Sequence, residues 1–302
     1  MESLDRREFL KISGAGLGSF LLQFPEESIS SSDASEDCMG MLFDATSCLG
    51  CKQCQVACRE QRSSVDAGVD AKDVDTSPDD LSADAWTIIK LYEDEEDKSI
   101  YSFVKVQCMH CVDPACVTAC PVGALQKTES GPVIYDSDLC IGCRYCMAAC
   151  PFDVPKYEWE KVFPLIKKCD FCADRQEAGL EPACAEACAN DVLKFGKRSE
   201  LIEEAKARIE ENPDRYVDHI YGEHEAGGTS KLYLSRVPFD KLGFPDLEDT
   251  SLPDLTWPWM SAIPGVVLGV GGLMGGVYWV SKRRVAKEEE EGRDDITNRT
   301  EE

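Results

Sequence analysis

The spacing of the cysteines constrains this chain more than any other feature. Sixteen of its seventeen cysteines lie between residues 48 and 188, where they form four groups of four. The groups are Cys48, Cys51, Cys54 and Cys58; Cys108, Cys111, Cys116 and Cys120; Cys140, Cys143, Cys146 and Cys150; and Cys169, Cys172, Cys184 and Cys188. The first and third groups have the spacing C-x2-C-x2-C-x3-C, and the second and fourth groups widen one gap. Such crowding requires tight loops that present several sulfurs to one small volume.

This spacing predicts [4Fe–4S] clusters. Three thiolates from one tight loop can bind three corners of a cubane, while the fourth cysteine follows the next turn and reaches a neighbouring cluster. Sixteen thiolates at four per cluster predict four clusters. We therefore predict that all sixteen cysteines bind cofactor iron and that the chain transfers electrons.

Disulfides and zinc are the alternative uses of so many cysteines. Disulfide frameworks belong mostly to short secreted chains, and they do not require this crowding. Zinc ribbons separate their two CxxC pairs by a long connection, whereas here three cysteines stand together before any gap. A zinc-stabilised membrane scaffold stays open as the alternative of a different class. There is no C-x-x-C-H sequence, which excludes covalent haem attachment.

The segments that flank the cysteine groups indicate an internal duplication. Short apolar segments precede the first and third groups, at Met41–Asp44 and Val133–Asp136, and similar segments follow the second and fourth. These segments favour β-strands, so we expect Ala124–Lys127 to pair with Pro132–Tyr135 in a hairpin. By the same logic Met41–Asp44 should pair with Val192–Phe195, which joins the first group to the last.

The last cysteine of each group is predicted to bind the cluster of the partner group, and this exchange assigns the ligands of all four clusters. In each unit, three cysteines of one group join the last cysteine of the partner group. We call the predicted sets cage A (Cys48, Cys51, Cys54 and Cys188), cage B (Cys58, Cys169, Cys172 and Cys184), cage C (Cys108, Cys111, Cys116 and Cys150) and cage D (Cys120, Cys140, Cys143 and Cys146). Pro121 and Pro151 follow the last cysteine of the two central groups, where their fixed φ turns the chain away from the cluster.

The first residues carry an export signal. Asp5-Arg6-Arg7-Glu8-Phe9-Leu10-Lys11 is a twin-arginine sequence, and an apolar stretch follows from Ile12 to Phe24. The twin-arginine route carries proteins already folded around their cofactors, which suits clusters inserted in the reducing cytoplasm. The sequence therefore predicts export by this route.

A segment near the C-terminus is predicted to cross a membrane. Residues Trp257 to Val280 contain no charge, and about 20 apolar residues span a hydrocarbon core. Basic residues follow at once, at Lys282, Arg283, Arg284 and Lys287. The positive-inside rule then predicts a single-pass protein of the cytoplasmic membrane, with a cytoplasmic C-terminus and the main domain on the periplasmic or extracytoplasmic face. The predicted fold class is α+β, with two ferredoxin-like [4Fe–4S] units from an internal duplication plus this helix.

Composition and local patterns define the remaining segments. The net charge of −25 does not favour nucleic acid as a partner. The predicted domains are a signal and linker at 1–36, a four-cluster domain at 37–200 with an acidic insertion at about 59–100, an accessory helix and strand region at 201–255, a transmembrane helix at 256–281 and an acidic cytoplasmic tail at 282–302.

Three further elements are predicted from local patterns. Trp86–Tyr92 and Tyr101–Val106 are apolar and β-prone, so they should form a hairpin. Ser199 is the predicted N-cap of a helix that runs to about Asn212, and Lys231–Val237 is a predicted strand.

Single residues outside the cysteine groups give weaker signals. His110 could donate a hydrogen bond to a cluster sulfur or simply pack, and Lys105 and Arg144 could raise cluster potentials or be surface charges. Cys38 is predicted to be a bystander. The sequence has no Ser/His/Asp arrangement, metal-hydrolase motif or Gly-rich phosphate loop. We therefore predict no catalytic residue and no catalysis by the chain alone.

The order of a twin-arginine signal, four ferredoxin-type groups and one C-terminal helix resembles the iron–sulfur subunits of the dimethyl sulfoxide reductase β-subunit family. Within it, the chain is most similar to the electron-transfer subunit of hydrogenase-2 type membrane complexes. The matching stretches include Gly40-Met41-Leu42-Phe43-Asp44, Gln107-Cys108-Met109-His110-Cys111-Val112-Asp113-Pro114 and Gly142-Cys143-Arg144-Tyr145-Cys146. Formate dehydrogenase β-subunits share the anchor and the clusters.

This resemblance implies a relay of electrons between two partners. One is a catalytic subunit at the outer face, a nickel–iron uptake hydrogenase in the preferred interpretation. The other is a quinone-reactive integral-membrane subunit. The alternative is the β-subunit of a membrane-bound formate dehydrogenase or another molybdopterin oxidoreductase.

Overall fold

The structure is a computed structural model that describes residues 38–65 and 79–299. The predicted signal at residues 1–36 lies outside the described residues, as do residues 66–78 of the predicted acidic insertion. The chain divides into two compact units, with a boundary between Leu255 and Thr256. The described residues before this boundary form the cysteine unit, which contains all four cysteine groups.

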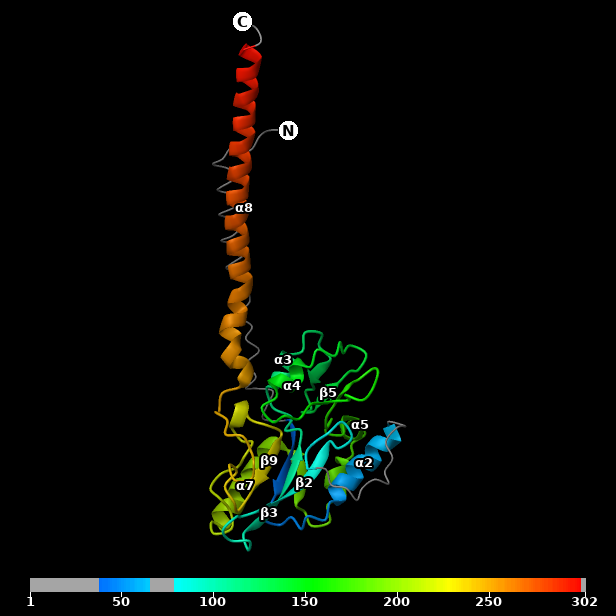
Figure 1. The fold of residues 1–302 in the computed structure, drawn as a ribbon. Coiled ribbons are helices and arrows are strands. Elements are labelled where there is room, and N and C mark those ends of the chain that lie inside the picture. The colour runs from blue at the N-terminus through cyan, green and yellow to red at the C-terminus, as the bar shows by residue number, and fades with distance from the viewer. Residues whose placement is uncertain (1–37, 66–78, 300–302) are drawn as a thin grey trace. The chain divides into compact units, whose positions relative to one another are not determined.

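A three-stranded sheet lies at the centre of the cysteine unit (Figure 1). Its middle strand β1 (Met39–Asp44) pairs antiparallel with β8 (Leu193–Lys197) and parallel with β9 (Lys231–Leu234). Met41 lies opposite Phe195, which confirms the predicted pairing of these segments. Because β1 is covered on both faces, it is apolar almost throughout and buried from its second residue onward. The sheet brings the first and last cysteine groups together.

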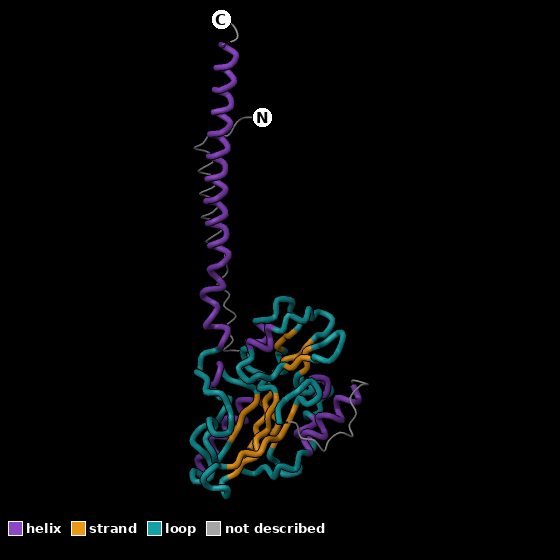
Figure 2. Tube along the Cα trace, viewed as in Figure 1, coloured by secondary structure: helices purple, strands orange, loops and turns teal. Residues whose placement is uncertain are grey.

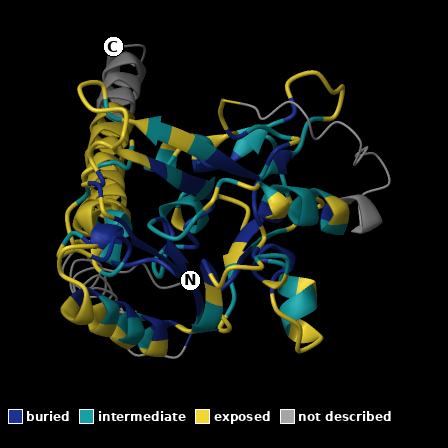
Figure 3. Ribbon diagram, turned by 90° about the horizontal axis from the view of Figure 1, so that it is seen from below, coloured by how far each residue is buried: buried dark blue, intermediate teal, exposed yellow. Residues whose placement is uncertain are grey.

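One face of this sheet is covered by helix α7 (Arg198–Glu211). Leu201, Ala205 and Ile209 recur at helical spacing and pack against Leu42 of β1. Figure 3 shows buried residues gathered along the strands. The opposite face of β1 packs in a second, larger apolar cluster that includes several of the cysteines.

The predicted N-cap of α7 was wrong. The helix begins at Arg198 with Lys197 in the capping position, so Ser199 lies in the first turn. The cause is that β8 continues through Lys197 directly into the helix, and the Arg198 N–H donates to the Cys38 carbonyl over 2.9 Å. The predicted end near Asn212 is confirmed, since the helix ends at Glu211.

Three antiparallel hairpins surround the sheet (Figure 2). They are β2 (Thr87–Glu93) with β3 (Tyr101–Gln107), β4 (Leu125–Lys127) with β5 (Val133–Tyr135), and β6 (Lys156–Tyr157) with β7 (Ile166–Lys167). The first two confirm the predicted hairpins. Strand β9 is shorter than predicted, because the Val237 N–H donates to the Ser235 hydroxyl in a turn after Leu234.

The remaining elements of the cysteine unit are mostly short helices that carry or follow cysteines. They are α2 (Gln53–Val65), α3 (Ala115–Thr118), α4 (Tyr145–Ala149), α5 (Ala173–Glu177), α6 (Ala183–Glu186) and the 3-10 helix η1 (Glu225–Gly227). Cys54 and Cys58 lie in α2, whereas Cys116, Cys146 and Cys184 each lie in a helix of only four or five residues.

Helix α8 (Leu252–Arg299) extends well beyond the predicted limits of 256–281 at both ends. Its Leu252–Lys287 segment is long and apolar enough to cross a membrane, with a mean hydropathy of 1.6 and no part of its apolar window buried in protein. Length and composition thus allow membrane anchoring. Pro258 and Pro264 lie inside the helix, as lipid-embedded helices tolerate.

Candidate iron–sulfur cluster cages

Each cysteine group uses the same backbone turn. The residue just before the second cysteine is left-handed in all four groups, with φ values of 66° at Gly50, 49° at His110, 69° at Gly142 and 62° at Phe171. Glycine adopts this conformation without strain, whereas His110 and Phe171 must be held in it by their surroundings. The turn directs backbone N–H groups at sulfur: the Phe171 N–H donates to Cys169 Sγ over 3.4 Å. Such bonds favour the thiolate form and stabilise cluster ligands.

The glycine in the first group also fits closely against its neighbours. A Cβ atom added to Gly50 would lie 2.4 Å from the Phe103 ring. The first cysteine loop therefore packs directly on strand β3, which fixes its position against the β2–β3 hairpin.

Three cavities are each lined by the four cysteines of one predicted cage. Cage A lines the first, cage B the second and cage D the third. Each set contains three cysteines of one group and the last cysteine of another, as the exchange predicts. For cage C, the Cys111 thiol lies within electrostatic range of the thiols of Cys108, Cys150 and Cys116. Among neighbouring thiols, these three raise the pKa of Cys111 most. The structure thus brings each predicted set together, while cluster ligation itself stays a prediction.

Cages A, B and D surround small cavities, and their thiols do not converge on a point. No group of three or more His, Cys, Asp or Glu side chains, within the part of the chain that the structure describes, is arranged to hold one metal ion. A cubane, by contrast, needs four thiols spaced around a volume. The donor set and its arrangement fit a [4Fe–4S] cluster in each cavity.

Burial controls the protonation of most of these thiols. Burial, together with the neighbouring Cys169 thiol, raises the pKa of Cys58 to about 12. Burial also raises the pKa of Cys54 to about 11, although the Lys105 ammonium opposes it. These thiols are protonated at neutral pH, so binding of iron must displace their protons.

Cys120 behaves differently because it lies near the surface in a loop rich in donors. Its slight burial is outweighed by backbone N–H groups that follow it, and these hold the pKa of Cys120 below its usual value. One of them, from Ala124, donates to Cys120 Sγ over 3.2 Å. This cysteine is therefore disposed to act as a thiolate ligand.

The cages follow one another in a line. Cys54 of cage A lies within electrostatic range of Cys184 of cage B. In the same way Cys169 of cage B is near Cys108 of cage C, and Cys116 of cage C is near Cys146 of cage D. The order is thus A, B, C, D.

The two ends of this line reach the surface. Cage A exposes Cys51 and cage D exposes Cys143, whereas every cysteine of cages B and C is buried or half-buried. The terminal cages A and D are thus accessible from solvent, while the two inner cages lie within the protein.

Several residues near the cages were not predicted or were predicted differently. Lys231 and Arg62 line the cavity of cage B, and neither belongs to a cysteine group. Lys105 is fully buried and is not a surface charge. Cys38 is likewise buried, with Sγ 3.8 Å from the Ser230 hydroxyl, so it is part of the core. No local pattern marks a lysine in a strand as buried.

His110 has a clear packing role. Its ring stacks on Phe171 at 5.0 Å between centroids, and its Nδ1 accepts a hydrogen bond from the Val133 N–H over 2.9 Å. Burial and nearby lysines hold the pKa of His110 well below its usual value, so the ring is neutral. The packing interpretation is confirmed, and a hydrogen bond to cluster sulfur stays a prediction.

Comparison with known proteins agrees with this arrangement. The 4Fe-4S dicluster domain family matches residues 99–198. A protein of Nitratidesulfovibrio vulgaris is 40% identical over 298 residues, which cover 95% of this chain and 80% of that protein. The hydrogenase-2 operon protein HybA of Escherichia coli O157:H7 is 36% identical over 286 residues, or 82% of this chain and 86% of HybA. The formate dehydrogenase-O iron-sulfur subunit of Escherichia coli K12 is 40% identical over 197 residues, or 64% and 65% of the two chains.

Fold, cages and relatives together define a carrier of multiple [4Fe–4S] clusters that transfers electrons and is not catalytic alone. The chain belongs to the iron–sulfur electron-transfer family of the dimethyl sulfoxide reductase type, with HybA and the formate dehydrogenase iron–sulfur subunits.

Proposed function

We propose that this chain relays electrons through four [4Fe–4S] clusters, one in each of cages A to D. The relay connects a catalytic subunit on the extracytoplasmic face of a membrane with a quinone-reactive integral-membrane subunit. One observation carries the proposal: the four-cysteine sets follow one another in line, with an exposed cysteine at each end of the line. A relay needs this arrangement, because each partner must approach one terminal cluster.

In this function the chain's own residues hold, tune and insulate the clusters. Four thiolates bind each cluster, and backbone N–H groups such as that of Gly142, 3.4 Å from Cys140 Sγ, donate to the ligand sulfurs. When bound, the clusters supply one-electron exchange. The apolar packing around the inner cages excludes water, which keeps the cluster sulfurs from solvent and fixes the distances between cages.

A nickel–iron hydrogenase is the catalytic partner that we favour. The likeness to HybA extends over 82% of this chain and 86% of HybA, whereas that to the formate dehydrogenase-O subunit covers 64% of this chain. The longer match includes segments outside the cysteine groups. A formate dehydrogenase or another molybdopterin oxidoreductase is the second candidate.

The proposal includes a membrane topology. Helix α8 supplies one possible membrane span, and Lys282, Arg283 and Arg284 follow its apolar part. The positive-inside rule then favours a cytoplasmic C-terminus and an extracytoplasmic cysteine unit. The twin-arginine sequence at residues 5–11 supports the same orientation independently, because it directs export of folded proteins.

The membrane subunit is proposed to dock beside cage D. Outside α8, Val162 and Phe163 are the most exposed large apolar side chains among the described residues, at 88% and 87%. They lie in the β6–β7 connection, where Arg144 stacks over Trp159 with 4.9 Å between the guanidinium carbon and the ring centre. Arg144 follows the exposed Cys143 directly. An apolar surface next to a terminal cluster suits a membrane-embedded partner.

Co-purification tests these partners. A tagged chain extracted in mild detergent should bring down a nickel–iron large subunit together with a membrane subunit. Changing Val162→Asp and Phe163→Asp together should weaken retention of the membrane subunit at least about tenfold, because two charges would enter an apolar contact. Retention of the catalytic subunit should not change.

The matched control is Ile100→Asp, which adds a charge at an exposed apolar residue of the β2–β3 connection. Recovery of a molybdopterin subunit would favour the second candidate. Equal retention of the membrane subunit in all variants would remove the docking assignment.

A further inference from the structure

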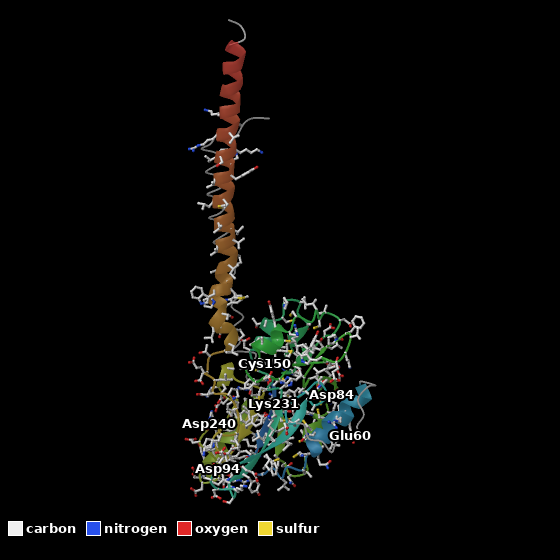
Figure 4. The ribbon with its side chains drawn as sticks, in the orientation of Figure 1. Glu60, Asp84, Asp94, Cys150, Lys231 and Asp240 are labelled. Atoms are coloured by element: carbon white, nitrogen blue, oxygen red, sulfur yellow. The ribbon has the colours of Figure 1, made fainter. Side chains whose placement is uncertain are left out.

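Among the residues that the structure describes, four lysines around the inner cages form no ion pair with a carboxylate. Lys105, Lys168 and Lys231 are buried, with 0%, 5% and 1% of their surface exposed, and Lys127 is half-buried. Lys231, labelled in Figure 4, lies inside the cysteine unit, whereas the labelled Asp94 and Asp240 lie at its margin. Burying an ammonium group without an opposite charge is strongly unfavourable, so these positions need an explanation.

The ammonium groups contact neutral atoms. Lys105 donates to the Gln107 side chain, and Lys168 donates to the carbonyls of Val133 and Cys169. Lys127 donates to the carbonyls of His110, over 3.2 Å, and Gly131, over 2.6 Å.

Lys231 is held in the same way. Its Nζ lies 3.0 Å from the centre of the Phe171 ring and 3.6 Å from the Met41 sulfur. Within the described ranges 38–65 and 79–299, none of the four lysines forms an ion pair with an acidic side chain.

The groups in range that become anionic when a cluster binds are the cysteine thiols. Lys231 lines the cavity of cage B, and its ammonium group lies within electrostatic range of the Cys169 and Cys184 thiols. The Lys105 ammonium group lies within electrostatic range of the Cys184 thiol of cage B and the Cys54 thiol of cage A. The lysines thus surround the line of cages at its middle.

Lys127 and Lys168 lie near the thiols of cage C. Lys127 lies within electrostatic range of the buried Cys38, which is outside the cages, and of Cys111 and Cys108. Lys168 lies within range of Cys116. Apart from Cys38, these cysteines share one cage, cage C. Each inner cage therefore has two lysines beside it.

Burial and the neighbouring thiols act in opposite directions on the pKa values of the two lysines of cage B. Burial lowers the pKa of Lys105, but nearby thiols more than offset this and hold it above its usual value. Burial lowers the pKa of Lys231 to about 8, with the thiols of Cys169 and Cys184 opposing the shift. A bound anionic cluster would strengthen that opposition.

A cluster with four thiolate ligands is an anion and gains a further negative charge on reduction. Burial away from water disfavours that extra charge, and an acidic protein of net charge −25 adds to the difficulty. Without compensation, the inner clusters would accept electrons less readily than the exposed terminal clusters. A relay through them would then contain an uphill step in its middle.

We propose that Lys105 and Lys231 are fixed counter-charges that keep the cluster of cage B reducible, and that Lys127 and Lys168 do the same for cage C. The inference rests on the proposed function, since it requires clusters in these cages. It adds that four residues outside the ligand set adjust the potentials of the two inner clusters. The four lysines bring the reduction potentials of the inner clusters close to those of the terminal clusters.

The test is a redox titration followed by EPR on the full-length protein in detergent. In Lys231→Met, which keeps the shape but removes the charge, the equilibrium constant for reducing the cage B cluster should fall at least about tenfold. For a one-electron couple this is about 59 mV. The signal of cage B is assigned as the one lost in Cys172→Ala, and the cage A and cage D signals should keep their midpoints.

Two further variants separate charge from structure. Lys194→Met removes a half-exposed lysine of β8, in the same sheet as Lys231, that pairs with Glu204 of helix α7, and it should shift no midpoint. Lys231→Arg keeps the charge and should stay near the wild-type midpoint. If Lys231→Met loses the cage B cluster altogether, retention of that cluster in Lys231→Arg supports the counter-charge.

Unchanged midpoints in Lys231→Met would overturn the inference, as would loss of the cluster in both Lys231→Met and Lys231→Arg. An equal shift in Lys194→Met would also overturn it. A wild-type protein without iron–sulfur signals would instead refute the proposed function, so the two failures are distinguishable.

Discussion

Replacing Cys48 and Cys188 together by alanine should remove one cluster, whereas replacing Cys48 and Cys58 together should remove two. The reason is the exchange of the last cysteine between groups. Cys48 and Cys188 line the cavity of cage A, while Cys58 lines that of cage B. Loss of one ligand from a cage should be enough to lose its cluster, and a second loss from the same cage adds nothing.

Iron and acid-labile sulfide per chain measure the outcome. The Cys48/Cys188 variant should lose about four iron atoms and the Cys48/Cys58 variant about eight. If each group held its own cluster, the second variant would lose one cluster and the first would lose two, which reverses the prediction. Cys38→Ala is the control, because Cys38 is a buried cysteine outside the four cages and its loss should leave the iron content unchanged.

Removing the clusters should unfold the region around β4 and β5 and leave the central sheet folded. The apolar core of this region is small, with few fully buried residues: Leu125, Val133, Cys146 and Ile166. Half-buried cysteines of cages C and D make up much of the rest. The cluster ligands are therefore part of this core, and binding of the metal is coupled to folding.

The central sheet has an independent core. Strand β1 is packed between two apolar clusters, one formed with α7 and one with the aromatic residues Tyr221, Tyr233 and Phe239. These contacts do not require iron. The sheet should thus survive conditions that destroy the clusters, although the loops that carry cage A would loosen.

Hydrogen exchange followed by mass spectrometry distinguishes the two regions. After oxidative cluster removal with a chelator, amides between residues 115 and 167 should lose protection by about a hundredfold or more. Amides of Met39–Asp44 should lose much less. Uniform loss over the whole cysteine unit would contradict the prediction, as would full protection throughout.

The cysteine sets and the strand pairings were predictable because both depend on local spacing. The gap lengths within a group determine which three sulfurs lie on one tight loop. A short apolar segment at the same offset from each group marks a strand, and the pairing of these strands indicates which two groups lie together. The pairing of β1 with β8 and that of β4 with β5 follow from these offsets, whereas the residue-by-residue register comes from the structure. Boundaries were less predictable, since Ser199 has a capping side chain but the preceding strand runs straight into the helix.

The buried lysines could not be predicted from the sequence. Lysine is almost never fully buried unless it is paired, and Lys231 stands at the start of an ordinary strand, far in sequence from the cysteine groups. Its burial results from the parallel pairing of β9 with β1, which is a tertiary contact. Lys105 is buried because the hairpin of β2 and β3 packs near cages A and B.

The most direct test of the whole account is the cofactor content of the anaerobically purified chain. Iron, acid-labile sulfide and zinc are measured per polypeptide, together with the EPR spectrum after dithionite reduction. Four cubanes require about sixteen iron atoms and about sixteen sulfides per chain, with overlapping signals of four interacting clusters. A colourless protein that contains zinc but no sulfide, and gives no EPR signal, would contradict the presence of these clusters and support a zinc-stabilised membrane scaffold.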